Sequence, residues 1–257
     1  MTVQFTLKDL KAAGERYHRG PDGKLRIDEM YKSLLLGTRD STPWKRVSEA
    51  ERFVRVWGGS LPYVSKGRAT RTIMRFAKTW GDQLSDLSRL PLQSLSETQL
   101  DKVGELFLHL RGAREKPSLG AVPSGKLLHF FMPDTVLLWD NLYVRGPLLL
   151  EEWTYLDGSR PESEKRQFVA LQRFGRKLLH RFKETGTRDC LEVARVEHSV
   201  VAQCDEPLTR MLDHIFYDRE GIRERAILSV GGLEGAVGHY CPDYCHCREC
   251  CAAERIQ

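Results

Sequence analysis

Amphipathic helical periodicity recurs along most of this 257-residue chain, whereas the alternating pattern of a half-buried strand is scarce. Apolar residues that return every three or four positions line one face of a helix. Helices are predicted on this basis at residues 6–18, 26–36, 45–57, 64–80, 96–111, 125–132, 147–153, 164–185 and 207–217. Stretches rich in Gly, Pro, Ser or Asp separate them, at 37–43, 57–62, 81–95, 112–125 and 157–162. We therefore predict an all-α fold.

The composition is ordinary for a globular protein. With 41% hydrophobic and 29% charged residues, the chain can bury one substantial core or two modest lobes. No apolar run approaches the roughly 18 residues that a membrane helix requires, and the N-terminus lacks the apolar segment of a signal peptide. We expect an intracellular, cytoplasmic monomer of the prokaryotic type, with no membrane partner. The net charge of +5 permits a polyanionic partner without requiring one.

Two predicted helices carry basic residues along one side. In residues 64–80, helical spacing places four cations on one face: Arg68, Arg71, Arg75 and Lys78. In residues 164–183, basic residues lie largely outside the apolar stripe: Arg166, Arg173, Arg176, Lys177 and Arg181. Both rows could follow DNA phosphates. For either helix alone, a solvated face that keeps the protein soluble is an equal alternative.

The segment from Gly120 to Arg145 sets one lysine and one aspartate at the two ends of a short apolar unit. Small residues up to position 125 predict a turn, and the apolar run that Lys126 opens predicts a helix that ends at Met132. The chain then passes through four apolar residues to Asp140, in a connection between two predicted helices. Taken alone, this aspartate is explained as a helix N-cap beside a tryptophan.

This order of turn, lysine, apolar helix, loop and aspartate resembles the hairpin and catalytic loop of the helix-hairpin-helix DNA glycosylases of the endonuclease III type. Residues Asp140 to Arg145 are similar to the family's Asp-Thr-His-hydrophobic-x-Arg loop. The resemblance implies a two-lobed fold. Residues 44–140 would form the central lobe, 1–43 would pack with a C-terminal lobe at 141–238, and 239–257 would form a cysteine-rich tail.

The resemblance also implies roles for individual residues. Asp140 would be the catalytic carboxylate, because cleavage of an N-glycosidic bond builds positive charge on the deoxyribose. Lys126 would attack C1′ and form a Schiff base if its pKa is lowered, and a structural or phosphate-contacting role is the alternative. The hairpin, with Ser124 and Gly125, would present backbone amides to phosphate at the helix start, and Arg145 would add a DNA contact.

An enzyme of this kind must also flip the base out of the duplex and hold it. Trp57 and Tyr63 lie in a loop just before the first basic helix and are candidates for wedge and stacking residues. Trp139 and Asn141 flank the aspartate and are candidates for the base pocket. Ordinary packing explains each aromatic residue as well.

Five of the seven cysteines lie near the C-terminus: Cys241, Cys245, Cys247, Cys250 and Cys251. The first four have the spacing C-x3-C-x-C-x2-C, which can bring four thiolates around one zinc ion or one [4Fe-4S] cluster. Several endonuclease III-like enzymes carry a four-cysteine cluster loop at this place in the chain. An inert tail and disulfides are alternatives, so the predicted cofactor is zinc, [4Fe-4S], or none.

These features predict a DNA glycosylase that releases a damaged or modified base from double-stranded DNA. A modified base in foreign DNA, as in antiphage defence, is a more specific option. The alternative is a non-catalytic helical nucleic-acid-binding protein with a metal-stapled tail. A third hypothesis is a metal- or redox-sensing protein centred on the cysteines.

Overall fold

A computed structural model describes residues 7–18, 31, 42–56, 66–112, 119–139, 161–184, 195 and 206–217. Within these ranges every regular element is helical and no strand occurs, which confirms the predicted all-α class for them. The elements are α1 (Leu7–His18), η1 (Pro43–Arg46), α3 (Val47–Val56), α4 (Lys66–Ser88), η2 (Leu92–Ser94), α5 (Glu97–Arg111), α6 (Ala121–Phe131), α8 (Pro161–Glu184) and α10 (Leu208–Tyr217). None of these helices is long and apolar enough to cross a bilayer.

The helix α5 shows how local signals set the boundaries of an element. Ser96 is its N-cap: the Ser96 hydroxyl accepts from the amide of Gln99 at 3.2 Å, and the Gln99 side chain accepts from the amide of Ser96 at 2.8 Å. This reciprocal pair satisfies two amides that the first helical turn leaves without partners. The helix ends at Gly112, whose positive φ of 75° suits a glycine. Local signals therefore set both ends of the helix predicted at residues 96–111.

The helix α4 is longer than predicted. A break was expected from residue 81, but the helix continues through Gly81 to Ser88. A Cβ atom at Gly81 would lie 3.1 Å from the ring of Trp44, so glycine lets this ring pack closely on the helix. Buried Leu84 and Leu87 continue the apolar face beyond it. Their packing outweighs the roughly 1 kcal/mol that a glycine costs in a helix interior.

The helix α6 starts five residues before Lys126, so the predicted turn up to residue 125 is wrong. Gly120, with a φ of 85°, directly precedes the helix, and the amide of Ser124 donates to its carbonyl at 3.2 Å. Pro123 is the third residue of the helix, where the missing N–H would have had no partner within the helix. Lys126 therefore lies in the middle of α6.

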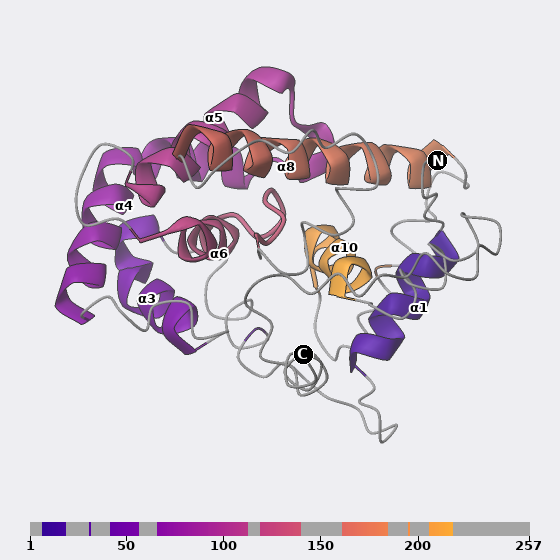
Figure 1. Cartoon of the computed structure of the whole chain (residues 1–257), viewed down its shortest axis with the longest axis horizontal. Helices are drawn as coiled ribbons and strands as arrows, with labels where there is room; N and C mark the ends of the chain where they lie inside the picture. Colours follow the sequence, from indigo (N-terminus) through magenta and orange to yellow (C-terminus); the bar gives the residue numbers. More distant parts are fainter. Residues whose placement is uncertain are drawn as a thin grey trace, which may run out of the picture.

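Packing between the helices brings distant parts of the chain together (Figure 1). α5 and α8 lie side by side, α6 packs against α5 and α3, and α4 contacts both α3 and α5. α1 packs against α10, so segments from near the two ends of the described chain meet. Gly104 allows a close approach of α5 to α8, because a Cβ atom there would lie 2.5 Å from Val169 Cγ2.

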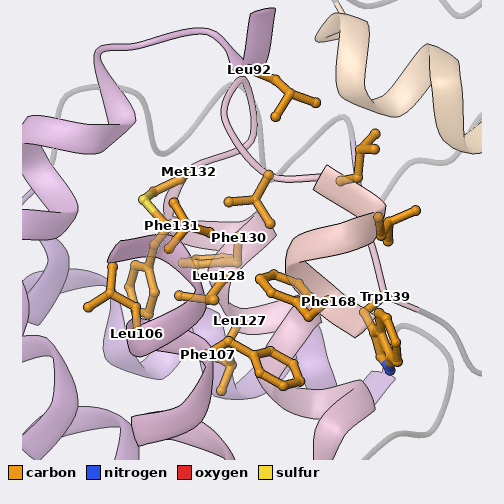
Figure 2. Close-up of a cluster of buried hydrophobic side chains, with 14 of the residues drawn as sticks. Leu92, Leu106, Phe107, Leu127, Leu128, Phe130, Phe131, Met132, Trp139 and Phe168 are labelled. Atoms are coloured by element: carbon orange, nitrogen blue, oxygen red, sulfur yellow. The ribbon is translucent and has the colours of Figure 1, made fainter. Parts of the chain in front are cut away.

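The core is centred on α6, which is buried along nearly its whole length. Figure 2 shows its apolar side chains beside aromatic residues from α5 and α8. The rings of Phe107 and Phe168 stack with centroids 4.2 Å apart and planes 11° apart, which joins α5 to α8. Trp139 lies next to both rings, with centroids 6.2 and 6.1 Å away. The chain therefore leaves α6 through the interior of the protein.

Candidate functional site

Asp140, the predicted catalytic residue, lies outside the described residues, but the segment that leads to it is described. We call residues 132–139 the anchor segment. It follows α6 without regular structure and ends at Trp139, the neighbour of Asp140. All of its side chains are buried except those of Pro133 and Asp134, which are half-buried. A buried irregular segment needs hydrogen-bond partners for its backbone, and several elements supply them.

Gln172 of α8 binds the middle of the anchor segment through both atoms of its amide. Its Oε1 accepts from the backbone N–H of Leu137 at 2.8 Å, and its Nε2 donates to the carbonyl of Leu137 at 3.3 Å. Gln172 is fully buried. One side chain thus satisfies both the N–H and the carbonyl of Leu137, a buried residue that lies outside the helices.

The C-terminal end of α4 and the following turn hold the start of the anchor segment. The hydroxyl of Thr135 lies 3.0 Å from the carbonyl oxygen of Leu87 and 2.7 Å from that of Leu90. The amide of Leu92 donates to the carbonyl of Asp134 at 3.0 Å. These contacts join the anchor segment to α4 and η2.

The helix α10 holds the anchor segment from another side. The hydroxyl of Thr209 donates to the carbonyl of Pro133. Burial raises the pKa of Asp213 well above its usual value, although Arg210 acts in the opposite direction. Together with Gln172 and Thr135, Thr209 connects the anchor segment to three helices.

His129 of α6 completes the support of the anchor segment. Its Nδ1 lies 2.6 Å from the carbonyl oxygen of Val136, and its Nε2 lies 2.7 Å from the hydroxyl of Tyr31. Because a carbonyl can only accept, Nδ1 carries the proton and Nε2 accepts from the Tyr31 hydroxyl. Burial lowers the pKa of His129 to about 3 and raises that of Tyr31, so both groups are neutral at pH 7.

We expect His129 to make the folded state sensitive to acid. Its pKa is about 3 in the folded chain and 6.5 as an unperturbed group. Below pH 6.5, His129 therefore binds a proton more readily in the unfolded chain than in the folded chain. The contribution of His129 to stability is complete above pH 6.5 and falls by about 1.4 kcal/mol per pH unit as the pH drops toward 3. Urea unfolding of wild type and His129→Gln from about pH 7 to about pH 4 measures this effect. A difference between the two proteins that stays constant with pH would contradict it.

A buried polar cluster, which was not predicted from the sequence, joins α1 to α10. Its members are His18, Glu206, Arg210, Asp213 and His214, and each is at most 1% exposed. In the helix predicted at 207–217, three of these polar residues recur at helical spacing among the apolar ones. That pattern is the signal that could have revealed the cluster, because polar residues on an apolar face indicate buried polar partners.

Aromatic rings surround the charged groups of this cluster. The guanidinium of Arg210 donates to the hydroxyl of Tyr17 at 2.5 Å and lies 4.9 Å from the ring centroids of Tyr17 and Tyr31. The rings of Tyr17 and His214 stack, with centroids 4.1 Å apart. Burial acts to lower the pKa of Arg210, but the interactions with Tyr17, Glu206 and Asp213 outweigh this effect. The pKa is therefore raised above its usual value, and the guanidinium stays charged.

The predicted residues on α6 and in the anchor segment are buried. The Ser124 hydroxyl donates to the carbonyl of Gly120 at 2.6 Å, and Gly125 faces Trp139 across a gap too small for a Cβ atom. Lys126 is 5% exposed and Trp139 is fully buried. Because α6 begins at Ala121, the amides of Ser124 and Gly125 do not lie at its start. The burial of these residues is typical of side chains that pack in the core.

The basic face predicted on α4 is confirmed for the side chains that the structure describes. Arg71, Arg75 and Lys78 are exposed, whereas Ile73 and Phe76 on the other side are buried. The backbone of Arg68 belongs to the same helix. The remaining predicted site residues lie outside the described ranges: Trp57, Tyr63, Asp140, Asn141, Arg145, Cys241, Cys245, Cys247 and Cys250.

The basic residues of α8 behave differently from those of α4, because two of them bind α5. Arg173 donates to Glu97 at 2.7 Å and to Asp101 at 3.2 Å. Arg176 pairs with Glu97 and donates to the carbonyl of Leu95 at 2.6 Å. Hydrogen bonding to Arg173 lowers the pKa of Glu97. These two arginines therefore join helices, and α8 offers fewer cations to a phosphate backbone than its sequence indicates.

Comparisons with protein-family models, with curated proteins and with solved structures found no match for this chain.

Proposed function

We propose that this protein is a DNA N-glycosylase and that Asp140 is its catalytic carboxylate. The observation that carries the proposal is the anchor segment, which is buried, hydrogen-bonded to α4, α8 and α10, and ends at the residue before Asp140. A carboxylate that stabilises an oxocarbenium-like state needs a fixed position relative to the sugar. Rigid supporting elements provide such a position.

The proposed substrate is double-stranded DNA that contains a damaged or modified base. The exposed basic face of α4 supports this part of the proposal, because a row of cations at helical spacing can follow phosphates. The packing of α1 on α10 supports the two-lobed arrangement of the helix-hairpin-helix glycosylases, in which the two ends of the chain share one lobe.

The proposed chemistry is hydrolytic. A lysine that forms a Schiff base must reach C1′ of the sugar, and Lys126 is 5% exposed in the middle of α6. In the hydrolytic reaction Asp140 orients a water molecule and stabilises the charge that develops on the deoxyribose as the bond to the base breaks. Lys126 then contributes to the packing of α6.

Base release tests the proposal directly. Purified protein is mixed with normal, damaged and phage-modified duplex DNAs, and free bases are measured by mass spectrometry. We expect one class of base to be released, and Asp140→Asn to slow this release at least about 100-fold. Asp101→Asn is the matched control, because Asp101 is exposed on α5 and lies outside the proposed DNA-binding helix. No release from a broad panel, with DNA binding intact, would favour the non-catalytic binding protein.

Removing the basic face of α4 is expected to weaken DNA binding. The combined variant Arg71→Gln, Arg75→Gln and Lys78→Gln loses up to three phosphate contacts. The slope of log K against log salt concentration should therefore fall in magnitude by about 2–3. Fluorescence anisotropy with duplex DNA at several salt concentrations measures this slope. The control is Arg166→Gln with Lys177→Gln, two exposed sites on α8. An equal change in the control would mean that α4 is not the DNA-binding face.

A further inference from the structure

The buried polar cluster contains three side chains with metal-ligating atoms close together. His18 ends α1, Glu206 precedes α10, and His214 lies within α10. One ligand atom from each residue lies within 4.8 Å of the others. His18 Nε2 is 3.5 Å from Glu206 Oε2, and His214 Nε2 is 3.7 Å from the same oxygen. His18 and His214 belong to two helices near opposite ends of the described chain, and Glu206 lies just before the second of them.

We propose that His18, Glu206 and His214 bind a divalent transition metal ion such as Zn²⁺. Zinc bonds to imidazole nitrogen and carboxylate oxygen are about 2.0–2.1 Å long, so ligands of a tetrahedral ion lie about 3.3 Å apart. The two distances to Glu206 are only slightly longer than this. The planes of the two imidazole rings are 89° apart and their centroids are 5.1 Å apart, so the rings meet edge to face.

The ligand set selects the class of ion. Two imidazoles and one carboxylate suit Zn²⁺ and its first-row neighbours, whereas Ca²⁺ and Mg²⁺ prefer oxygen ligands. The site is almost completely buried, with His18, Glu206 and His214 at most 1% exposed. Three protein ligands leave the fourth position of a tetrahedral zinc ion for a water molecule.

The carboxyl group of Glu206 is the group that would gain from a bound cation. Arg210 brings one guanidinium into the cluster, and its NH2 group donates to Tyr17. Buried carboxylates are costly unless positive charge accompanies them. A divalent ion at Glu206 would add this charge and would tie α1 to α10. Because such a site forms only in the folded chain, ion binding would add directly to stability.

Metal analysis of the 257-residue chain tests this inference, which is independent of the glycosylase proposal because no DNA is involved. The predicted metal site in the cysteine tail must first be removed with Cys241→Ser, Cys245→Ser, Cys247→Ser, Cys250→Ser and Cys251→Ser. This tail variant is incubated with Zn²⁺, dialysed and analysed by mass spectrometry. We expect about one zinc ion per chain, and nearly none after His214→Gln is added. His180→Gln, an exposed histidine of α8, is the control that should keep the ion.

A second measurement covers the case in which His214→Gln does not fold. A strong chelator should lower the melting temperature of the tail variant, and added Zn²⁺ should restore it. Co²⁺ in place of zinc should give weak visible bands without the charge-transfer band of a thiolate ligand. The inference is overturned if the tail variant retains no zinc, if a folded His214→Gln protein retains its zinc, or if the melting temperature does not respond to chelator.

Discussion

Replacement of Gln172 by leucine is expected to lower the free energy of unfolding by about 2–5 kcal/mol. The amide of Gln172 satisfies both the N–H and the carbonyl of Leu137, and all of these groups are buried. Leucine has a similar volume but no polar atom, so both backbone groups lose this partner. Each unsatisfied buried group costs roughly 1–3 kcal/mol. Urea denaturation followed by circular dichroism measures the change.

Two further variants separate the hydrogen bonds from general effects of the substitution. Gln172→Glu keeps an acceptor for the N–H of Leu137, and at a pH where its carboxyl is protonated the O–H can donate to the carbonyl of Leu137. At that pH its stability should therefore lie between wild type and Gln172→Leu. Gln83→Leu, at an exposed site on α4, should change stability by less than about 0.5 kcal/mol. Equal losses for Gln172→Leu and Gln83→Leu would show that the bonds to Leu137 contribute little.

Replacement of Gly125 by alanine is expected to destabilise the protein by about 1–3 kcal/mol and to reduce base release. The new Cβ atom would overlap Cβ of Trp139 and lie 3.4 Å from its Cα. These atoms cannot rotate away, so α6 or the end of the anchor segment must move. A helix interior otherwise favours alanine over glycine by up to about 1 kcal/mol, which makes a loss of stability informative.

Gly67→Ala is the matched control for this substitution. Gly67 lies in α4, and a Cβ atom there would meet only the end of the Arg71 side chain at 3.6 Å. We expect this variant to be as stable as wild type or slightly more stable. Base release at a temperature where all variants are folded then distinguishes two effects of Gly125→Ala. Reduced release by the folded variant would support a positioning role of the anchor segment, and unchanged release would contradict it.

Residues close together in the sequence made parts of the fold predictable. The capping pair of Ser96 and Gln99 defines the start of α5 because both partners lie within one turn. The apolar stripe of α8 appeared as predicted, with Phe168, Leu171 and Phe182 buried. Amphipathic spacing of this kind depends only on the geometry of one helix.

The start of α6 was not predictable in the same way. Pro123 and Gly125 are typical of turns, yet both lie within a helix that the core surrounds. Gly125 is needed because Trp139 packs against it, and Trp139 lies 14 positions later in the sequence. Tertiary packing therefore overrode local propensity at this site.

For the described residues, the sequence by itself determined the all-α class, the approximate extent of several helices, and the exposed basic row of α4. Only the tertiary structure decided which partner covers each buried face and which polar groups meet. It showed that Arg173 and Arg176 bind α5, that Gln172 holds the anchor segment, and that Arg210 meets Tyr17 from 193 positions away. The physical reason is that helical periodicity records the burial of a side chain, whereas the identity of a distant partner depends on how whole helices pack.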